Sequence, residues 1–501
     1  MIERRRVLIV GAGFGGLGMA IALKAAGIDD FAVLEKGDDV GGVWRDNVYP
    51  GAACDIPSQL YSFSFAPKAD WSRTFAPQRE IFGYLKGIAD RYDLRGHMRF
   101  GTEVRSAEFH EGEGVWRVTS TSGLRFEARI LVTACGQLNR PLIPSLPGAD
   151  RFRGAAFHSA RWDDAFDLAG KRVAVVGTGA SAIQMVPSVV DRVRRLHLFQ
   201  RSAPYVIAKA DREFLPWERL LFGKVPAVMR LNRGGIYAAY EARALGLVVA
   251  PRLLALLERE FRRHLEASVD DPELRGRLVP DYPFGCKRVL LSNDYYPALQ
   301  RPNAELVTDA IREVTARGIV TVDGRERPVD AIVYATGFKA SEFLAPMAIR
   351  GRQGQDLHAV WKDGAEAYLG IAVSGFPNLF MLYGPNTNLG HNSIIYMLES
   401  QIRYVTRCVQ AIDGRKLRFV DVASKVQSAF NAEVQRRIAG SIWSGDCTSW
   451  YKTASGKNVN NWPGFTFAYR RRTRAPDLAD YEVAIDSSGT SGAGRAPKYS
   501  S

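Results

Sequence analysis

The sequence predicts an α/β fold with two Rossmann-like dinucleotide-binding domains and a helical insert in the second. Two separate Gly-rich turns each follow a short buried-strand pattern and precede a helical pattern. Apolar residues at helical spacing over residues 214–280 interrupt the module of the second turn. A chain of 501 residues is also too long for a single core, so two or three domains are expected.

Composition and charge describe an ordinary globular protein, with 46% hydrophobic and 24% charged residues. The formal net charge is +14, but the basic residues are spread out and no aromatic-and-basic motif accompanies them. A nucleic-acid partner is therefore not expected, and the positive field suits anionic cofactors. The longest apolar run, residues 245–257, is too short to cross a bilayer, and glycines interrupt the N-terminal apolar run. We expect a soluble, cytoplasmic protein without a transmembrane segment.

Cysteine spacing gives a second indication of the compartment. No Cys-x-x-Cys pair and no metal-ligand spacing occurs, which predicts a reducing compartment with no disulfide framework and no bound metal. The five cysteines are Cys54, Cys135, Cys286, Cys408 and Cys447.

The first Gly-rich turn directly follows the apolar run Val-Leu-Ile-Val. Gly11, Gly13 and Gly16 give G-x-G-x-x-G between a strand and a helix. The first glycine permits the tight turn, the second lets backbone N–H groups approach a pyrophosphate, and the third lets the helix pack on the strand. Glu35 ends the next strand pattern, at the distance expected for binding a ribose hydroxyl.

A loop with large side chains follows over residues 41–55. Glycines and a proline fix its geometry, and Trp44 and Tyr49 are suited to enclosing a planar ring system. Asp55 is a carboxylate in an otherwise apolar loop. It could simply cap the next helix at the surface, but its place after a dinucleotide motif favours a role that faces the cofactor.

Residues 152–163 lie between the two modules and fit neither an amphipathic helix nor an alternating strand, so we expect a packed loop. An ordinary linker that buries Phe152 and Trp162 is the simpler alternative.

The second Gly-rich turn carries Gly177, Gly179 and Ala182 in G-x-G-x-x-A, again between a strand and a helix. Its next strand ends in Arg201-Ser202 and not in an acid. A cation and a hydroxyl suit a 2′-phosphate, which favours NADPH over NADH. The alternative is a solvated surface arginine.

The rest of the chain is expected to return to both modules. The helical insert is expected to cover a cleft, and the segment after Asp281 to re-enter the sheet with the adjacent cations Lys287 and Arg288, which need anionic partners if buried. A strand near Phe380 and a helix over 393–412 are expected to close the first module. We expect these domains: 1–145, FAD-binding, first segment; 146–212, NADP-binding, first segment; 213–285, insert; 286–338, NADP-binding, second segment; 339–485, FAD-binding, closing segment; 486–501, disordered tail.

With these motifs, the chain resembles the type I Baeyer–Villiger monooxygenases of the flavin-containing monooxygenase superfamily. Residues 152–163 fit the fingerprint F-x-G-x-x-x-H-x-x-x-W-[P/D] through Phe152, Gly154, His158, Trp162 and Asp163, and residues 41–55 fit a second signature. Trp162 and Asp163 favour the Baeyer–Villiger branch over relatives that oxidise nitrogen and sulfur. The loop after Trp450 departs from the best-known ketone-oxidising members, which concerns the substrate pocket and not the chemistry.

The resemblance implies an FAD- and NADPH-dependent enzyme that uses O2 to convert a ketone into an ester or lactone through a C4a-peroxyflavin. It implies that Arg288 stabilises the anionic oxygen donor, that Asp55 holds Arg288, and that His158 and Trp162 couple the domains. The residues expected to contact FAD are Gly11, Gly13, Phe14, Gly16, Glu35, Lys36, Gly42, Val43, Trp44, Asp55, Tyr61, Val104, Gln137 and Asn386. Those expected to contact NADPH are Gly177, Thr178, Gly179, Ala180, Ser181, Ala182, Arg201, Ser202 and Lys287.

Three other functions compete with this one. A flavin monooxygenase that oxidises sulfur or nitrogen of soft nucleophiles is the nearest. A pyridine-nucleotide disulfide reductase shares the two-module layout but needs a close redox-active cysteine pair, which the spacing does not offer. The third alternative is a non-catalytic flavoprotein, and the combination of Asp55, Lys287 and Arg288 argues against it.

Overall fold

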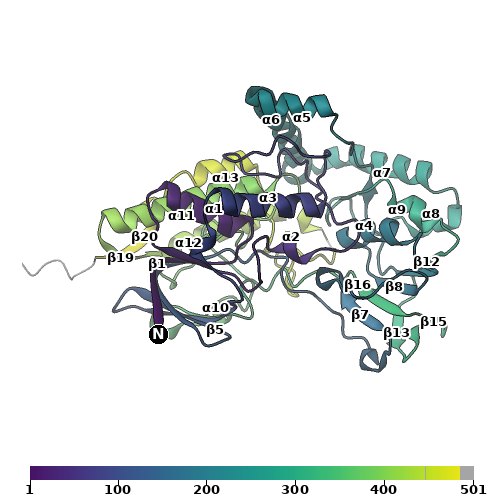
Figure 1. Cartoon of the computed structure of the whole chain (residues 1–501), viewed down its shortest axis with the longest axis horizontal. Helices are drawn as coiled ribbons and strands as arrows, with labels where there is room; N and C mark the ends of the chain where they lie inside the picture. Colours follow the sequence, from purple (N-terminus) through teal and green to yellow (C-terminus); the bar gives the residue numbers. More distant parts are fainter. Residues whose placement is uncertain (446, 486–501) are drawn as a thin grey trace, which may run out of the picture.

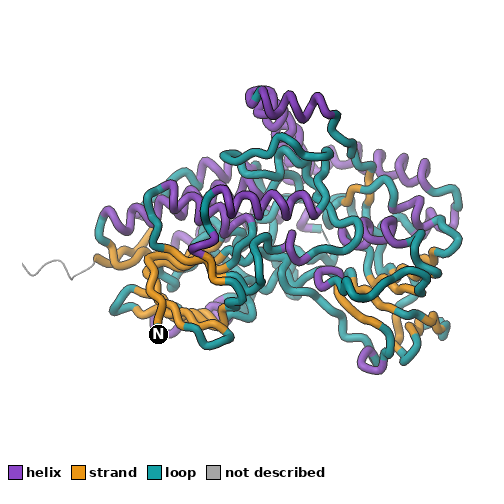
Figure 2. The backbone as a smooth tube through the Cα atoms, in the orientation of Figure 1, coloured by secondary structure: helices purple, strands orange, loops and turns teal. Residues whose placement is uncertain are grey.

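The computed structural model describes residues 1–445 and 447–485, and the tail predicted for 486–501 lies outside them. Two groups of strands occupy opposite ends of the molecule, and loops and helices fill the space between them (Figures 1 and 2). The first group is built from both ends of the described chain, and the second from its middle. The predicted α/β class with two separate modules is confirmed.

The first module contains an eight-stranded sheet in which parallel and antiparallel pairs meet. Strand β1 pairs in parallel with both β2 and β6, and Val7 to Val10 are buried because helices and loops cover both faces. The sheet has the order β17 (Ala348–Arg350), β4 (Val104–His110), β5 (Val115–Ser120), β6 (Arg125–Thr133), β1 (Ile2–Val10), β2 (Phe31–Leu34), β3 (Met98–Arg99), with β18 (Leu379–Met381) also on β6.

Helices α1, α2 and α3 and the last third of the chain complete this module. Helix α11 packs against α1, and β18 joins β6, so the predicted return of the chain to the first module is confirmed. The elements are α1 (Phe14–Ala25), α2 (Val43–Asp46), α3 (Gln78–Arg91), α10 (Leu357–Val360), α11 (Ile394–Gly414), α12 (Ser424–Ala439) and α13 (Thr466–Arg472), with the antiparallel pair β19 (Leu417–Val422) and β20 (Tyr481–Ile485).

The second module contains a five-stranded, wholly parallel sheet. Its central strands are buried on both faces, as their unbroken apolar sequences require. The order is β12 (Ala304–Val307), β9 (Arg195–Phe199), β8 (Arg172–Val176), β16 (Ala331–Tyr334), β7 (Ala155–His158), with α4 (Ala180–Val189) and α9 (Tyr295–Leu299) packed together beside it. A small antiparallel sheet of β13 (Ile311–Val314), β14 (Gly318–Thr321) and β15 (Glu326–Pro328) lies before β16.

The prediction of a loop over residues 152–163 is wrong for its centre. Ala155 to His158 form β7, an edge strand paired in parallel with β16, and Ser159–Arg161 form a 3₁₀ turn. Only one of the four strand residues is buried, so no period-2 pattern marks the strand in the sequence. Backbone pairing at the sheet edge, which leaves no side-chain signature, defines it.

The helical insert is confirmed, and it touches both modules. In α6 the ring of Tyr237 stacks on Tyr396 of α11 with centroids 4.9 Å apart, whereas Phe261 of α7 packs on Tyr205 of the second module at 4.8 Å. Figure 1 shows α5 and α6 at the top of the view, with α7 toward the second module. The helices are α5 (Pro216–Lys224), α6 (Pro226–Ala244), α7 (Leu254–Ser268) and α8 (Pro272–Arg277), with a π-helical segment (Leu245–Val249) after α6.

The chain leaves the insert differently from the prediction. Strand β11 (Leu290–Leu291) pairs only with β10 (Val206–Ile207) in a separate two-stranded sheet, and the chain re-enters the main sheet at β12. The expected direct return after Asp281 is therefore wrong. This detour places Lys287 and Arg288 in a loop between the modules and not on a buried strand.

The cysteine prediction is also wrong, because Cys286 and Cys447 form a disulfide with Cα atoms 6.6 Å apart. The two residues are 161 positions apart in the sequence, so short-range spacing could not reveal them. Cys54, Cys135 and Cys408 are free. None of the described helices combines the length and the apolar character that crossing a bilayer requires.

Candidate active site

The first Gly-rich turn has the shape of a pyrophosphate cradle. Gly11 has φ +104°, and a Cβ atom there would lie 2.7 Å from the carbonyl oxygen of Ala134. A Cβ on Gly16 would overlap the carbonyl oxygen of Gly11. Helix α1 begins after Gly13 with no side-chain cap, so its first N–H groups are available to an anion.

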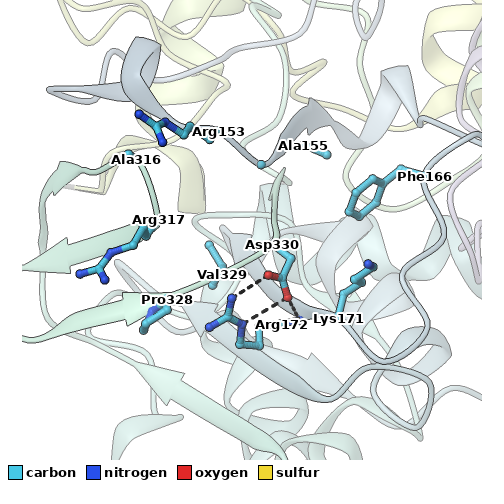
Figure 3. Close-up of a pocket in the computed structure, with 11 residues that line it drawn as sticks. Arg153, Ala155, Phe166, Lys171, Arg172, Ala316, Arg317, Pro328, Val329 and Asp330 are labelled. Carbon is cyan, nitrogen blue, oxygen red and sulfur yellow. Dashed lines mark hydrogen bonds and ion pairs between the residues drawn. The ribbon is translucent and has the colours of Figure 1, made fainter.

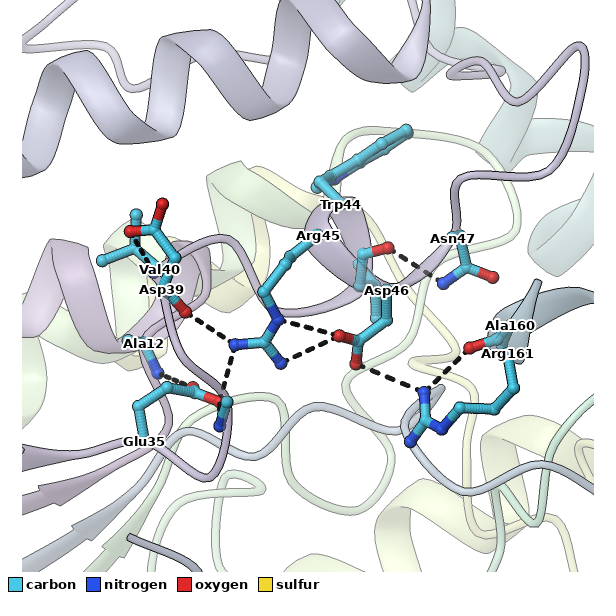
Figure 4. Close-up of polar contacts among 12 residues, drawn as sticks. Ala12, Glu35, Asp39, Val40, Trp44, Arg45, Asp46, Asn47, Ala160 and Arg161 are labelled. Carbon is cyan, nitrogen blue, oxygen red and sulfur yellow. Dashed lines mark hydrogen bonds and ion pairs between the residues drawn. The ribbon is translucent and has the colours of Figure 1, made fainter. Parts of the chain in front are cut away.

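The buried Glu35 carboxylate lies beside this turn (Figure 4). It accepts hydrogen bonds from the backbone N–H groups of Ala12 and Gly37, both at 2.8 Å, and from Arg45 Nη1 at 3.0 Å. A carboxylate has about four acceptor positions, so one stays open for a ribose hydroxyl. Arg45 was not among the predicted residues, although it follows Trp44 directly.

Three of the predicted aromatic residues meet next to the cradle. The Tyr61 ring lies edge-on to Phe14 at 5.3 Å and to Trp44 at 5.6 Å between centroids. Trp44 Nε1 donates a hydrogen bond of 3.3 Å to the Tyr61 hydroxyl, whose pKa burial raises well above its ordinary value. Gly42 has φ +53° and precedes Val43, the first residue of α2. These residues form an apolar wall suited to a flat ring system.

A hollow of about 510 Å³ separates the first module from the fingerprint segment. Lys36, predicted to contact FAD, lines it on one side, and Ala160 to Trp162 line it on the other. Arg161 forms an ion pair with Asp46 at 3.6 Å across this hollow (Figure 4). The fingerprint therefore touches the first module through Arg161, which the motif itself leaves unspecified.

Gln137 and Asn386 follow the ends of β6 and β18, two strands that pair with each other. Gln137 Nε2 donates to the carbonyl oxygen of Tyr383 at 3.3 Å, and Asn386 Nδ2 donates to that of Asn458 at 2.9 Å. Among the described residues, neither Gln137 Oε1 nor Asn386 Oδ1 has a hydrogen-bond partner, although both are buried. Such atoms need a polar partner, so this position suits a ligand with hydrogen-bond donors at its edge. Val104, in contrast, packs into the apolar core of the first module.

The second Gly-rich turn repeats the cradle geometry in the second module. Gly177 has φ +105°, and a Cβ there would lie 2.5 Å from the carbonyl oxygen of Ala335. Gly179 and Ala180 are exposed at the uncapped start of α4, and Ala182 is buried against the sheet. The Thr178 hydroxyl donates to the carbonyl oxygen of Ser202 at 3.0 Å.

Two cations gather beside this turn. Lys287 Nζ donates to Ser202 Oγ at 3.2 Å and lies 4.0 Å from the centroid of the Tyr282 ring. Burial lowers the pKa of Lys287, and the neighbouring Arg201 lowers it further. No carboxylate of the described residues forms an ion pair with either cation. The cluster of Thr178, Arg201, Ser202 and Lys287 thus has the chemistry of a phosphate site.

We expect Arg201→Ala to weaken discrimination between the two nicotinamide cofactors. A charge-assisted hydrogen bond contributes about 1.5–3 kcal/mol, so kcat/KM for NADPH should fall about 10–100-fold while that for NADH changes little. Steady-state kinetics with both cofactors measure this. Arg194→Ala, which removes an exposed cation elsewhere on the same module, should leave the ratio unchanged. Equal losses with NADPH and NADH would contradict a 2′-phosphate contact.

The loop over residues 41–55 also contacts the second module. The Tyr49 hydroxyl donates to Gln184 Oε1 of α4 at 2.9 Å, and Gln184 Nε2 donates to the carbonyl oxygen of Ala53 at 3.0 Å. Ser181, one of the predicted residues, lies near the same hydroxyl, and burial raises the pKa of Tyr49 to about 12. Gln184 gave no signal in the sequence because it follows the Gly-rich turn as an ordinary helical residue.

Arg288 and Asp55 meet between the modules. Arg288 Nε and Nη2 lie 2.8 and 2.6 Å from the same Asp55 oxygen, and Nη1 donates to the carbonyl oxygen of Leu389 at 3.4 Å. The Asp55 carboxylate raises the pKa of Arg288 above its ordinary value, against the effect of burial. A permanently charged guanidinium is thus held by two separate parts of the chain, Asp55 and the carbonyl of Leu389. Leu389 was not predicted.

The buried Tyr451 and the partly buried Tyr383 lie close enough to this guanidinium to be affected by its charge. Burial raises the pKa of Tyr451 to about 12, and Arg288 acts in the opposite direction. Burial also raises the pKa of Tyr383, again opposed by Arg288. Tyr451 follows Trp450 in the loop expected to concern the substrate pocket, and this loop contributes directly to the surroundings of Arg288.

Comparison with known proteins identifies the family. The family model described as flavin-binding monooxygenase-like matches residues 4–245. A Baeyer–Villiger monooxygenase of Pseudomonas aeruginosa is 46% identical over 480 residues, covering 95% of this chain and 91% of the relative. The chain belongs to the Baeyer–Villiger monooxygenases.

Solved structures agree with this placement. The closed crystal structure of cyclohexanone monooxygenase has a TM-score of 0.86 at 29% identity, covering 97% of this chain and 100% of the other. The open structure of cyclohexanone monooxygenase gives 0.81 at 28% identity, covering 96% and 99%. The protein OTEMO, solved in complex with FAD and NADP, gives 0.87 at 26% identity, covering 97% and 100%.

In this Baeyer–Villiger monooxygenase the fingerprint histidine is fixed in one neutral form. Ala160 N donates to His158 Nδ1 at 3.1 Å, so Nε2 carries the proton and donates to the carbonyl oxygen of Gly337 at 2.9 Å. Burial lowers the pKa of His158 below its ordinary value of 6.5. Both hydrogen bonds lie within the second module, whereas Arg161 of the same segment reaches Asp46 of the first module.

This histidine should make stability depend on pH. Because its pKa is lower in the folded chain, the unfolded chain takes up the proton first, so its contribution is complete above about pH 6.5 and is lost as the pH falls. The glutamine of His158→Gln can accept and donate hydrogen bonds without titrating. Between about pH 7.5 and pH 5.5, the melting temperature of this variant should therefore fall by less than that of the wild type. An identical loss in both proteins would contradict the neutral assignment. His197, whose pKa burial also lowers, is present in both.

A larger cavity of about 630 Å³ lies away from this site (Figure 3). It opens at the N-terminal ends of β7, β8 and β16, whereas the second Gly-rich turn follows the C-terminal end of β8. Arg172 pairs with Asp330 at 2.7 Å on its wall, joining the starts of two strands. None of the predicted cofactor or catalytic residues lines it.

Proposed function

We propose that the chain inserts one oxygen atom of O2 next to the carbonyl of a small-molecule ketone to give an ester or lactone, with FAD and NADPH as cofactors. The observation that carries the proposal is the Arg288–Asp55 pair, assembled between the two nucleotide cradles. Membership of the Baeyer–Villiger monooxygenases supports the reaction class. The two cradles account for both cofactors.

When it is bound and reduced by NADPH, FAD supplies the activated oxygen. The chain binds the cofactors, orients the substrate and excludes water from the site. The turn from Gly11 to Gly16, Glu35 and the wall of Phe14, Trp44 and Tyr61 would hold FAD. The turn from Gly177 to Ala182, with Arg201, Ser202 and Lys287, would hold NADPH. These residue roles are our proposal, supported by the cradles and by the unpartnered buried atoms described above.

Arg288 supplies the charge that ketone chemistry requires. Attack on a carbonyl carbon needs an anionic oxygen nucleophile, and a cation fixed nearby stabilises that charge without having to reorganise during the reaction. Asp55 positions the guanidinium and limits its rotation through two short contacts to one oxygen. Among the described residues, Nη1 has one partner, the Leu389 carbonyl at a long 3.4 Å, so donor capacity remains for the reacting oxygen.

Parallel incubation with a ketone and a thioether tests the proposal. The FAD-loaded protein is supplied with NADPH in air, and the products are identified by mass spectrometry. We expect cyclic or aryl ketones to gain one oxygen as a lactone or ester. Thioether oxidation without any ester, over a broad ketone panel, would move the chain to the heteroatom-oxidising branch.

We also propose a cytoplasmic location and the domain division given above, with boundaries near residues 145, 212, 285 and 338. Consumption of NADPH supports the location. The two sheets, whose strands fall on either side of these boundaries, support the division. Cell fractionation and limited proteolysis test the two points.

A further inference from the structure

We propose that Cys286 and Cys447 form a redox-modification site, a reversible disulfide that fastens the C-terminal segment to the loop carrying Lys287 and Arg288. The two residues are 161 positions apart, and their Cα separation of 6.6 Å lies within the range that a disulfide spans. The bond closes a very long loop and connects the two modules.

Both cysteines lie beside groups placed in the active site. Cys286 directly precedes Lys287 and Arg288. Cys447 lies just before Trp450 and Tyr451, the loop that reaches the surroundings of Arg288. A bond between the two segments therefore restrains both Lys287 of the phosphate cluster and the surroundings of Arg288.

Other contacts already bring these segments together, so the thiols stay close when the bond is open. Ile442 packs against the apolar cluster that contains Phe284. The backbones are also neighbours, since an added Cβ at Gly285 would lie 3.7 Å from Ile442 Cγ1 and one at Gly445 would lie 4.0 Å from Cys286 Sγ. Lys452 Nζ donates to the carbonyl oxygen of Gly445 at 2.7 Å, holding the C-terminal turn in shape. Re-formation of the bond then needs little chain rearrangement.

The remaining thiols are poor competitors for an oxidant. Burial raises the pKa of Cys54 and Cys408 strongly, and that of Cys135 to about 12, so little thiolate forms at any of them. Cys447 is half-buried, whereas Cys286 is 1% exposed. Reagents therefore reach the pair through Cys447.

The chemistry balances with hydrogen peroxide as the oxidant. The Cys447 thiolate attacks one peroxide oxygen, giving a sulfenic acid and, after protonation, one water. The Cys286 thiol then attacks the Cys447 sulfur, the S–S bond forms, and a second water leaves. A small dithiol reverses the reaction by thiol–disulfide exchange and is itself oxidised.

The bonded form corresponds to the closed arrangement of the modules. The structure matches the closed form of cyclohexanone monooxygenase with a TM-score of 0.86 and the open form with 0.81. Because the disulfide joins the second module to the closing segment of the first, separation of the modules stretches it. We expect the oxidised enzyme to open less and to release NADP⁺ more slowly.

Thiol counting on the FAD-loaded full chain tests the site without any ketone. After peroxide treatment, removal of excess peroxide and denaturation, Ellman's reagent should find three of the five thiols, and after dithiothreitol all five. Cys408→Ala is the matched control. It should show one thiol fewer than the wild type both after peroxide and after dithiothreitol, so the two treatments should still differ by two thiols. Cys286→Ser and Cys447→Ser should show no intramolecular disulfide. Five free thiols in the treated wild type would overturn the proposal.

The regulatory effect is measured by displacing NADP⁺ in a stopped-flow instrument. We expect release to be about tenfold slower in the oxidised wild type, restored by dithiothreitol, and independent of oxidation in Cys447→Ser. Three thiols with an unchanged release rate would overturn the switch. This test rests on NADP binding and not on the ketone reaction, so its failure and that of the proposed function are distinguishable.

Discussion

Arg288→Ala should lower the rate of oxygen insertion about 10²–10³-fold while FAD reduction by NADPH proceeds at close to the wild-type rate. The guanidinium lies between the modules, bonded to Asp55 and Leu389, whereas the predicted NADPH contacts belong to Lys287, Arg201 and the second cradle. Removing one preorganised group that stabilises developing charge costs about 10²–10³-fold in kcat. Anaerobic stopped-flow absorbance follows the reduction, and ester formation per NADPH follows the insertion.

Two further variants separate charge from geometry. Arg288→Lys keeps the charge but loses the planar fork, so it should recover only part of the insertion. Asp55→Asn leaves Arg288 charged but less firmly held, so kcat for insertion should fall more than the reduction rate. Full ketone turnover by Arg288→Ala would refute the assignment. A matching collapse of reduction would show a general structural role instead.

Gly16→Ala should yield protein without FAD. A Cβ at Gly16 would overlap the carbonyl oxygen of Gly11, and neither backbone can yield without opening the cradle. Overpacking of this kind costs about 1–3 kcal/mol in side-chain cores, and backbone is less forgiving. The ratio of flavin absorbance to protein absorbance in the purified variant measures occupancy.

Gly15→Ala is the matched control, since its Cβ would lie 3.4 Å from Ala134 Cβ, an ordinary contact. That variant should remain yellow. NADPH binding to the second module and circular dichroism show whether Gly16→Ala has folded. Folded Gly16→Ala with full flavin content would contradict the cradle assignment.

The parts of the site that follow a strand end could be predicted from the sequence. The cradles need glycine because an added Cβ meets backbone, and that requirement is visible as G-x-G-x-x-[G/A] after an apolar run. Asp55 was indicated by its loop, Arg288 by the Lys287-Arg288 pair, and their contact with each other only by the family resemblance. The structure brings the two together across 233 residues.

What the sequence did not reveal depends on contacts between distant segments. Leu389 contributes a backbone carbonyl, which carries no residue signature, and Gln184 is an unremarkable helical residue until α4 meets the loop at Tyr49. Strand β7 exists through edge pairing with β16. The Cys286–Cys447 disulfide was not predicted because spacing rules detect only cysteines that are close in the sequence.

Oxygen isotope incorporation tests the central claim most directly. The FAD-loaded enzyme is given NADPH, a ketone that it turns over and ¹⁸O2, and the product mass and the NADPH consumed are measured together. The account predicts an ester or lactone carrying one ¹⁸O atom, with one NADPH oxidised for each product molecule. NADPH oxidation that yields only labelled hydrogen peroxide, with the ketone unchanged across the panel, would contradict it.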